Sequence, residues 1–320
     1  MSTAISAPNK LKVFSANANP SLAEEICEYL GITMGLSTTK TFCDGEISLE
    51  ISESVRGDDV FIVQPTCYPT NDNLMQLLIM IDAMKRASAR RITAVVPYYG
   101  YARQERKSKP RDPISAKLVA NLLTAAGANR VITMDLHASA IQGFFDIPVD
   151  HLPGVPLLAE YYKSLKDRDL TVVSPDLGGV TRARALADRL GASIAIIEKQ
   201  RPEANKAEIM SIIGKVKGKT VIMIDDIIDT AGTITKGASA LKKKGAAEIF
   251  ACCTHPIFSP PALKRLEESV ITEVLITNTI PVDFKRQGKC SKLKIVSVAS
   301  LLGEGIRHIH EEISVSELFD

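Results

Sequence analysis

Residues 221–233 constrain the fold of this chain more than any other segment, because a strand, an acidic pair and a turn of small residues follow one another directly. The run Val221–Ile224 is entirely apolar, which predicts a strand buried on both faces, as in a parallel sheet. Asp225 and Asp226 follow at its carboxyl end, and the turn 229–233 leads into a helical pattern. Because open α/β sheets bind ligands at the carboxyl ends of their strands, the segment predicts a binding site together with the fold.

The two halves of this segment suit different chemical groups. The turn offers hydroxyls and backbone N–H groups at the start of a helix, which favour a phosphate. Asp225 and Asp226 would repel a phosphate, but their oxygens can accept hydrogen bonds from ribose hydroxyls or bind a divalent cation. A strand end and a surface turn would each explain one half without any ligand. The complete string indicates a site for a phosphorylated sugar.

Composition narrows the class of protein. Of the 320 residues, 45% are hydrophobic and 24% are charged, as in an ordinary globular chain. The formal net charge of +2 argues against nucleic acid as the main partner. Lys and Arg gather instead in residues 103–111 and 199–206, which suits an anionic small molecule.

Cysteine usage and hydropathy indicate a cytoplasmic protein without a membrane partner. The six cysteines show no Cys-x-x-Cys spacing and are typical of reduced thiols. Residues 1–10 lack the apolar core of a signal peptide. No apolar run approaches the roughly 20 residues that a membrane-spanning helix needs.

Short apolar runs alternate with helical patterns along the whole chain. This order predicts mainly parallel sheets with helices on both faces, which is the doubly wound α/β class. The expected strands are too many for one sheet, so we expect two α/β domains. Proline and glycine cluster in residues 146–156. We therefore expect an N-terminal domain of residues 1–150 and a C-terminal domain of residues 151–320.

Three further strand ends carry polar side chains. Arg103 and Gln104 follow an apolar strand, beside tyrosines that could stack on a purine. His137 follows another expected strand, and Asp176 precedes two glycines after a third, where it could bind a cation. Taken singly, these residues are equally well explained by a solvated loop, a structural histidine and a simple turn.

Taken together, these motifs resemble the class I ribose-phosphate pyrophosphokinases (PRPP synthetases) along nearly the whole chain. The string 221–233 is similar to the binding motif for 5-phosphoribosyl 1-diphosphate (PRPP), which type I phosphoribosyltransferases share. The other resembling segments are 42–46, 73–87, 98–106, 135–148, 174–184, 199–205 and 314–319. Members transfer the diphosphoryl group of ATP to the 1-hydroxyl of ribose 5-phosphate, giving PRPP and AMP for nucleotide biosynthesis. The resemblance implies this activity, with Mg²⁺ as the cofactor.

On the ribose side, the resemblance implies that Asp225 and Asp226 bind the sugar hydroxyls. Lys199 and Arg201 match the catalytic pair of a mobile loop, and Arg201 also matches a ribose 5-phosphate contact. The implied binding residues for the 5-phosphate are Asp229, Thr230, Ala231, Gly232 and Thr233.

On the nucleotide side, the resemblance implies that Arg103 and Gln104 contact ATP. His137 and Asp176 match the magnesium positions. A loop that a neighbouring subunit contributes around the adenine is matched by Phe42, Asp44, Gly45 and Glu46.

Three residues depart from the family pattern. Gln200 and Glu203 stand where the family often has Arg, and Glu105 stands where Asp is usual. The first two make the catalytic loop less positive, so ATP affinity and turnover can differ from those of other members. None of the three removes a residue that we expect to act in catalysis.

The family is typically hexameric, and phosphate and ADP act at a regulatory site between subunits. The resemblance therefore implies a homo-oligomer with these two effectors. The matching positions are Ser54, Arg56, Ser88, Ser314, Ser316 and Phe319. The family pattern also suggests that the segment 306–310 packs on a domain other than its sequence neighbour.

Two alternative functions remain at this point. A phosphoribosyltransferase, which consumes PRPP, shares the string 221–233 but would not need Arg103, Gln104 or Lys199. A regulatory homologue without catalysis would be expected to have lost residues such as His137, Lys199 or Arg201, and all three are present.

Overall fold

The computed structural model describes residues 9–200 and 209–318, with only the backbone described for 199–200 and 209–210. The chain folds into two compact units. Unit 1 comprises the chain up to Pro153 together with the segment that begins at Val298, and unit 2 comprises Gly154–Ser297. The end of the chain thus belongs with its beginning. The expected second domain ran to residue 320, although the segment 306–310 was expected to pack on a domain other than its sequence neighbour.

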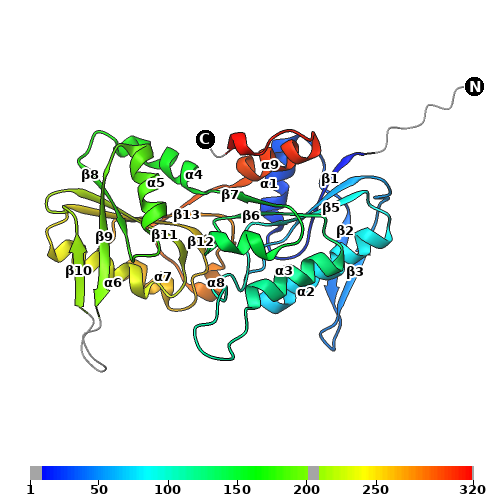
Figure 1. Ribbon diagram of the computed structural model, residues 1–320, viewed down its shortest axis with the longest axis horizontal. Coiled ribbons are helices and arrows are strands. Elements are labelled where there is room, and N and C mark those ends of the chain that lie inside the picture. Colours follow the sequence, from blue (N-terminus) through cyan, green and yellow to red (C-terminus); the bar gives the residue numbers. More distant parts are fainter. Residues whose placement is uncertain (1–8, 201–208, 319–320) are drawn as a thin grey trace, which may run out of the picture. The chain divides into compact units, whose positions relative to one another are not determined.

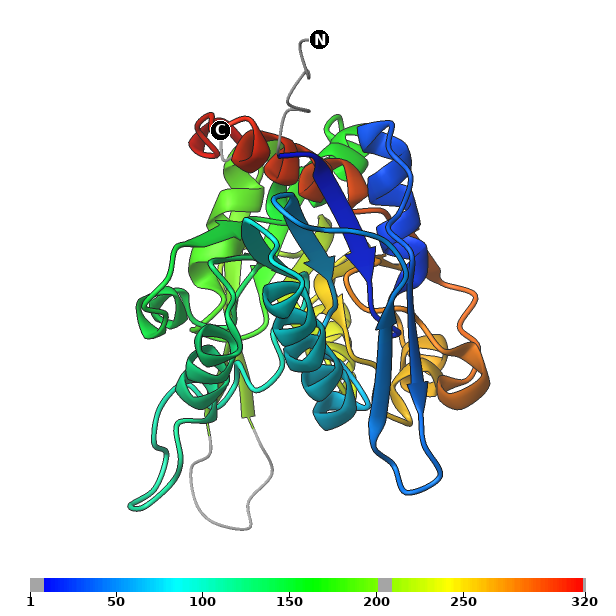
Figure 2. The same ribbon diagram turned by 90° about the vertical axis from the view of Figure 1, so that its right-hand side faces the viewer.

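Unit 1 is built on a parallel sheet with strand order β1-β4-β5-β6-β7. Every residue of β4 is buried, because consecutive side chains point to opposite faces and both faces are covered. Figures 1 and 2 show α1 and α9 side by side on one face, with α2 and α3 on the other. The strands are β1 (Leu11–Ser15), β4 (Asp59–Val63), β5 (Arg91–Val96), β6 (Arg130–Met134) and β7 (Val149–Leu152). The helices are α1 (Pro20–Leu30), α2 (Thr70–Arg86), α3 (Ser115–Ala126) and α9 (Ala299–His310).

Unit 1 also contains an antiparallel hairpin of β2 (Ser37–Thr41) and β3 (Ile47–Ile51), which forms a separate sheet. Two short 3₁₀ helices, η1 (Ser139–Phe144) and η3 (Ser316–Leu318), complete it.

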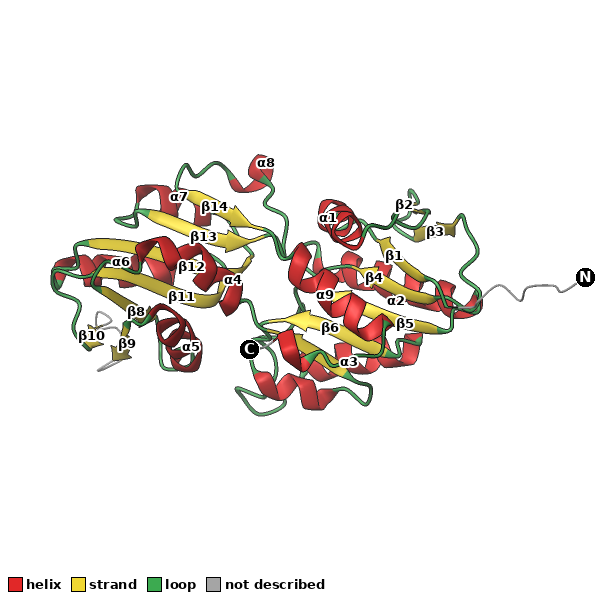
Figure 3. Cartoon of the chain, turned by 90° about the horizontal axis from the view of Figure 1, so that it is seen from above, coloured by secondary structure: helices red, strands yellow, loops and turns green. Residues whose placement is uncertain are grey.

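Unit 2 contains a larger sheet with strand order β10-β9-β8-β11-β12-β13-β14 (Figure 3). Among its described strands, only β10 runs antiparallel to its neighbour. Its strands are β8 (Leu170–Ser174), β9 (Ser193–Gln200), β10 (Ile209–Ile213), β11 (Thr220–Ile228), β12 (Glu248–Pro256), β13 (Glu273–Thr277) and β14 (Leu293–Val296). Its helices are α4 (Val155–Tyr162), α5 (Val180–Leu190), α6 (Gly232–Lys243), α7 (Ala262–Glu268) and α8 (Phe284–Gln287), with the 3₁₀ helix η2 (Lys163–Leu165).

Alternation along β11 shows why this sheet is covered on both sides. Val221 and Met223 belong to an apolar cluster with residues of α6 and α7. Ile222 and Ile224 belong to a second cluster with residues of α4 and α5. The expected class, mainly parallel sheets with helices on both faces, is therefore confirmed. Across the described ranges 9–200 and 209–318, no helix has the length and apolar character needed to cross a membrane.

Candidate active site

The acidic pair lies within β11 rather than after it, because the strand continues to Ile228. β11 pairs with β8 only as far as Met223, whereas its pairing with β12 continues to the end of the strand. Beyond Met223, therefore, β11 is no longer paired with β8. Asp225 and Asp226 occupy this stretch, with 20% and 6% of their side-chain surface exposed.

The turn after β11 leads directly into α6. Ala231 lies in the left-handed region at φ 59°, and α6 begins at the next residue. In the part of the chain that the structure describes, no side chain caps the N-terminus of α6. Arg265 of α7 supports the turn, because its Nη1 donates to the carbonyl oxygen of Thr230 at 3.0 Å. The N–H groups of the first helical turn, which none of the described side chains caps, can therefore bind an anion such as a phosphate.

One further carboxylate, that of Asp176, and one guanidinium, that of Arg182, act on the acidic pair. Burial, followed by the hydrogen bond and the repulsion from Asp226, raises the pKa of Asp225 well above its usual range. The charge of Arg182 opposes this shift, and that of Asp176 adds to it. Arg182 Nη1 lies 3.4 Å from Asp226 Oδ1 and 3.8 Å from Asp225 Oδ1. The composition of this cluster suits a ligand that donates hydrogen bonds.

Asp176 lies in a tight loop between β8 and α5. Its Oδ1 accepts a hydrogen bond from the Gly179 N–H at 3.0 Å, and Ser174 Oγ donates to its carbonyl oxygen at 2.6 Å. A Cβ at position 179 would lie 2.8 Å from Ser174 Oγ, so the loop needs glycine there. This loop holds a half-buried carboxylate at the carboxyl end of a strand next to β11.

His137 is exposed in the loop between β6 and η1 of unit 1. His151 of β7 braces this loop, since its Nε2 accepts from the Leu136 N–H at 2.8 Å. Sequence reasoning missed this supporting histidine, because it lies on a strand that only the fold places beside β6. His137 and Asp176 belong to different units.

The small number of protein ligands at this site fits a magnesium ion. Among the described residues, no group of three or more His, Cys, Asp or Glu side chains could hold a metal. Magnesium usually takes only one or two carboxylates and keeps waters and phosphate oxygens as its other ligands. Asp176 meets that requirement, whereas a structural zinc or calcium site would need more protein ligands.

Arg103 and Gln104 line a cavity of about 460 Å³ in unit 1, with residues from two strand ends. Gly100 N–H donates to Thr66 Oγ1 at 2.6 Å, which holds the loops after β4 and β5 together. Gln104 accepts from Ser115 Oγ at 2.6 Å. The β4–α2 half of the cavity was not anticipated from the sequence. The complete lining is Tyr68, Pro69, Thr70, Asn71, Asp72, Tyr98, Gly100, Tyr101, Arg103 and Gln104.

The segment 42–46 forms the tip of the β2–β3 hairpin. Phe42 N–H donates to the Glu46 carbonyl at 2.7 Å, and Asp44 Oδ1 accepts from the Glu46 N–H at 3.1 Å. Gly45 adopts φ 93° at this tip. The Phe42 side chain is 56% exposed at this tip.

The expected catalytic pair is only partly described. Lys199 is paired with Met210 in the β9–β10 ladder. Its side chain, and all of Arg201, lie outside the described residues, as do Glu203 and the side chain of Gln200.

The expected regulatory residues of unit 1 are all exposed where they are described. The loops of Ser54 and Ser88 meet through Gly57, whose N–H donates to the Ser88 carbonyl at 2.9 Å. Arg56 lies in the first of these loops. Ser314 and Ser316 follow α9, with their hydroxyls 2.8 Å apart. Phe319 lies outside the described residues.

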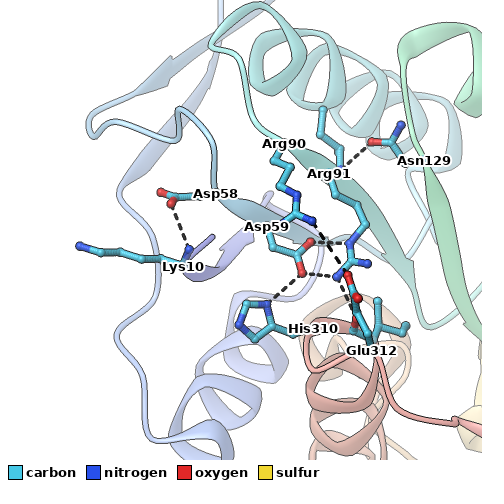
Figure 4. A network of polar contacts seen from close by, with 10 residues as sticks. Lys10, Asp58, Asp59, Arg90, Arg91, Asn129, His310 and Glu312 are labelled. Atoms are coloured by element: carbon cyan, nitrogen blue, oxygen red, sulfur yellow. Dashed lines mark hydrogen bonds and ion pairs between the residues drawn. The ribbon is translucent and has the colours of Figure 1, made fainter. Parts of the chain in front are cut away.

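A polar network ties α9 to the sheet of unit 1 (Figure 4). Fully buried Asp59 on β4 receives a hydrogen bond from Arg91 Nε at 2.8 Å, and His310 Nδ1 lies 3.0 Å from its Oδ2. Arg91 also donates to the Ile309 carbonyl at 2.8 Å. Packing of α9 on α1 and this network together explain why the end of the chain belongs to unit 1.

Two family models match the chain. One, described as the N-terminal domain of ribose phosphate pyrophosphokinase, matches residues 11–127. The other, described as a phosphoribosyl synthetase-associated domain, matches residues 202–320.

Curated relatives match over almost their full length. A ribose-phosphate pyrophosphokinase of Bacillus caldolyticus is 59% identical over 312 residues, which cover 98% of each chain. One of Caldanaerobacter subterraneus subsp. tengcongensis is 61% identical over 313 residues, 97% of this chain and 98% of the relative. A solved phosphoribosylpyrophosphate synthetase from Mycobacterium smegmatis is 44% identical with a TM-score of 0.89, covering 95% of this chain and 99% of that one.

Proposed function

Because the chain belongs to the ribose-phosphate pyrophosphokinase family, we propose that it transfers the diphosphoryl group of ATP to the 1-hydroxyl of ribose 5-phosphate. The products are PRPP and AMP, for nucleotide biosynthesis. The observation that carries the proposal is the order of groups along β11 and α6. Carboxylates on the strand suit sugar hydroxyls, and the start of α6, which none of the described side chains caps, suits a phosphate. One continuous segment can therefore bind both ends of ribose 5-phosphate.

On the ribose side, Asp225 and Asp226 accept hydrogen bonds from the hydroxyls of the pentose. The 5-phosphate binds the turn 229–233, which offers backbone N–H groups and the hydroxyls of Thr230 and Thr233. Support comes from the burial of the acidic pair, because a buried acceptor strongly favours a ligand that donates to it.

On the nucleotide side, Arg103 and Gln104 contact ATP in the cavity that they line. The cavity offers tyrosine rings for the base and a guanidinium for a phosphate. The hairpin tip with Phe42, Asp44, Gly45 and Glu46 serves the adenine of a neighbouring subunit in a homo-oligomer, which we propose to be a hexamer.

His137 and Asp176 would hold Mg²⁺, whose remaining ligands are water and phosphate oxygens. When bound, the ion offsets the charge of the triphosphate and polarises the phosphoryl group that is transferred. Lys199 and Arg201 stabilise the negative charge that develops at the β-phosphorus, and Arg201 also contacts ribose 5-phosphate. Catalysis then depends on in-line positioning and charge stabilisation rather than on a covalent intermediate.

Phosphate and ADP are the proposed effectors, and the proposed regulatory residues are Ser54, Arg56, Ser88, Ser314, Ser316 and Phe319. Hydroxyls beside an arginine suit an oxyanion. The protein is proposed to work in the cytoplasm, where ATP is available and thiols stay reduced. None of the six cysteines, which all lie in the described part of the chain, forms a disulfide.

The test is a steady-state assay with ATP, ribose 5-phosphate and Mg²⁺ and without any nucleobase. AMP and PRPP, measured by chromatography, should form in equal amounts, and AMP should not form without ribose 5-phosphate. Intact ATP would contradict the proposal. Consumption of added PRPP only with a nucleobase would identify a phosphoribosyltransferase instead. Varying phosphate and adding ADP in the same assay tests the two effectors.

A further inference from the structure

Arg182 is the side chain of α5 that faces the acidic pair, and the proposed function gives it no role. It lies in the first turn of the helix, and 17% of its side chain is exposed. One of its nitrogens, Nη1, is within ion-pair distance of both Asp225 and Asp226. A single guanidinium is therefore shared between two adjacent carboxylates.

The loop before α5 fixes the place of this guanidinium. The hydrogen bond from the Gly179 N–H to Asp176 ties the start of the helix to the end of β8. A Cβ at position 179 would lie 3.9 Å from Arg182 Nη1, so the guanidinium lies directly beside this loop. Arg182 therefore reaches the acidic pair from a backbone that β8 and its loop hold in place.

Without a cation, the acidic pair would be a poor acceptor for a sugar. Two neighbouring carboxylates in a largely buried site repel each other, and either loses its second acceptor oxygen when it takes up a proton. A guanidinium favours the ionised form of both and limits their orientation, because its planar donors have a fixed geometry. Its charge is balanced by the pair itself, which makes it ill suited to bind a substrate phosphate directly.

We propose that Arg182 is a positioning residue that keeps Asp225 and Asp226 as acceptors for the ribose hydroxyls, and that it thereby sets the preference for ribose 5-phosphate over 2-deoxyribose 5-phosphate. This inference rests on the proposed function. A site built to accept a hydrogen bond from a substrate hydroxyl rejects the analogue that lacks it. Removing the residue that orients the acceptors should therefore weaken discrimination between the two sugars rather than affinity for both.

The test compares kcat/KM for the two sugar phosphates in wild type, Arg182→Met and Arg182→Lys. Wild type should prefer ribose 5-phosphate by at least about tenfold, and Arg182→Met should reduce that preference to within about threefold. Arg182→Lys, which keeps a charge but not the fork, should fall between them. KM for ATP should stay within about twofold of wild type in all three.

Arg184→Met is the matched control, because it removes the same charge from an exposed position on the same helix. Its sugar preference should equal that of wild type. An unchanged preference in Arg182→Met would overturn the inference, as would a rise in KM for ATP comparable to that for ribose 5-phosphate, which would indicate direct contact with ATP.

Failures of the two proposals are separable. If wild type releases AMP but Arg182→Met keeps the wild-type preference, only the inference about Arg182 fails. If wild type releases no AMP, the proposed function fails, and calorimetric titration with each sugar phosphate still measures the ratio of affinities. The same titration serves if Arg182→Met folds, as judged by circular dichroism, but does not turn over. If it does not fold, the preference in Arg182→Lys decides: a wild-type ratio overturns the inference, and an intermediate ratio supports it.

Discussion

The proposed ribose side in unit 2 and the proposed nucleotide side in unit 1 both lie at the carboxyl ends of parallel strands, but they are built differently. On the ribose side, the carboxylates are inside a strand, largely buried, and held near a guanidinium before any ligand arrives. On the nucleotide side, two loops enclose a cavity whose rim residue Tyr68 is 63% exposed.

This difference predicts that substitutions on the two sides will change stability and affinity in different ways. Buried like charges make the folded state less favourable, so the ribose side trades stability for a preformed set of acceptors. The nucleotide side depends instead on the close approach of two loops at Gly100. Neutral substitutions of the acidic pair should therefore lower affinity without lowering stability, and a substitution at the loop contact should lower both.

Lys199→Ala should give the largest effect, because Lys199 is assigned to the transition state rather than to either binding side. We expect turnover to fall by about 10²-fold or more, with KM for ribose 5-phosphate little changed. The measurement is AMP release at saturating substrates. Lys215→Ala, at an exposed position in the same unit, is the control and should behave as wild type. A turnover number near that of wild type for Lys199→Ala would remove this residue from the catalytic set.

Asp225→Asn tests whether the Asp225 carboxylate lowers stability while it raises the affinity for ribose 5-phosphate. The raised pKa of Asp225 means that the folded state holds its proton more tightly than the unfolded chain, so the free energy of unfolding falls as the pH rises through the raised pKa. At pH 8 we therefore expect a higher Tm for the variant, together with a KM for ribose 5-phosphate raised about tenfold and an unchanged KM for ATP. Asp169→Asn, a mostly exposed carboxylate, is the control for both readouts. A lowered Tm without a change in KM would show that Asp225 is only structural.

Gly100→Ala tests the loop contact on the nucleotide side. A Cβ there would lie 2.4 Å from the Thr66 carbonyl oxygen, so the two loops must move apart. We expect a loss of about 1–3 kcal/mol in the free energy of unfolding and a KM for ATP raised several-fold, with KM for ribose 5-phosphate unchanged. Gly143→Ala is the matched control in unit 1, because a Cβ at that position meets nothing within 4 Å. Equal effects of the two substitutions would rule out a special role for the contact.

The smallest expected effect is a difference in labelling rate between two cysteines of unit 1. Burial, with the nearby charge of Glu24, raises the pKa of Cys27 to about 11, so only about one part in 10³ is thiolate at pH 8. Cys43 is exposed on the β2–β3 hairpin. Iodoacetamide at pH 8 should therefore label Cys43 well before Cys27, as followed by mass spectrometry of tryptic peptides. Faster labelling of Cys27 would mean that α1 opens readily. A Cys43→Ser variant identifies the peptide.

Sequence reasoning succeeded where a site lies on one continuous segment. The string 221–233 contains strand, carboxylates and helix start in order, and local patterning was enough to place them on β11 and α6. The strand was expected to end at the acidic pair, whereas β11 continues to Ile228. The pairing with β12 extends the strand, and such pairing depends on a partner distant in sequence.

Sequence reasoning was incomplete where a site needs two distant segments. The loop after β5 was recognised from its arginine and tyrosines, but residues 68–72 carry no comparable signal. The hairpin β2–β3 also escaped notice, because neither Ser37–Thr41 nor Ile47–Ile51 has the strongly apolar pattern of a core strand.

By itself, the sequence determined the α/β class, the family and the order of catalytic motifs, because hydrophobic periodicity and contiguous motifs are properties of local chain segments. Only the tertiary structure decided which distant groups share one environment. Arg182 reaches the acidic pair because β8 and β11 are neighbours, and α9 returns to unit 1 because Asp59 and Arg91 bind its last turn. Those contacts depend on strand order and on buried charge pairing, which no local pattern encodes.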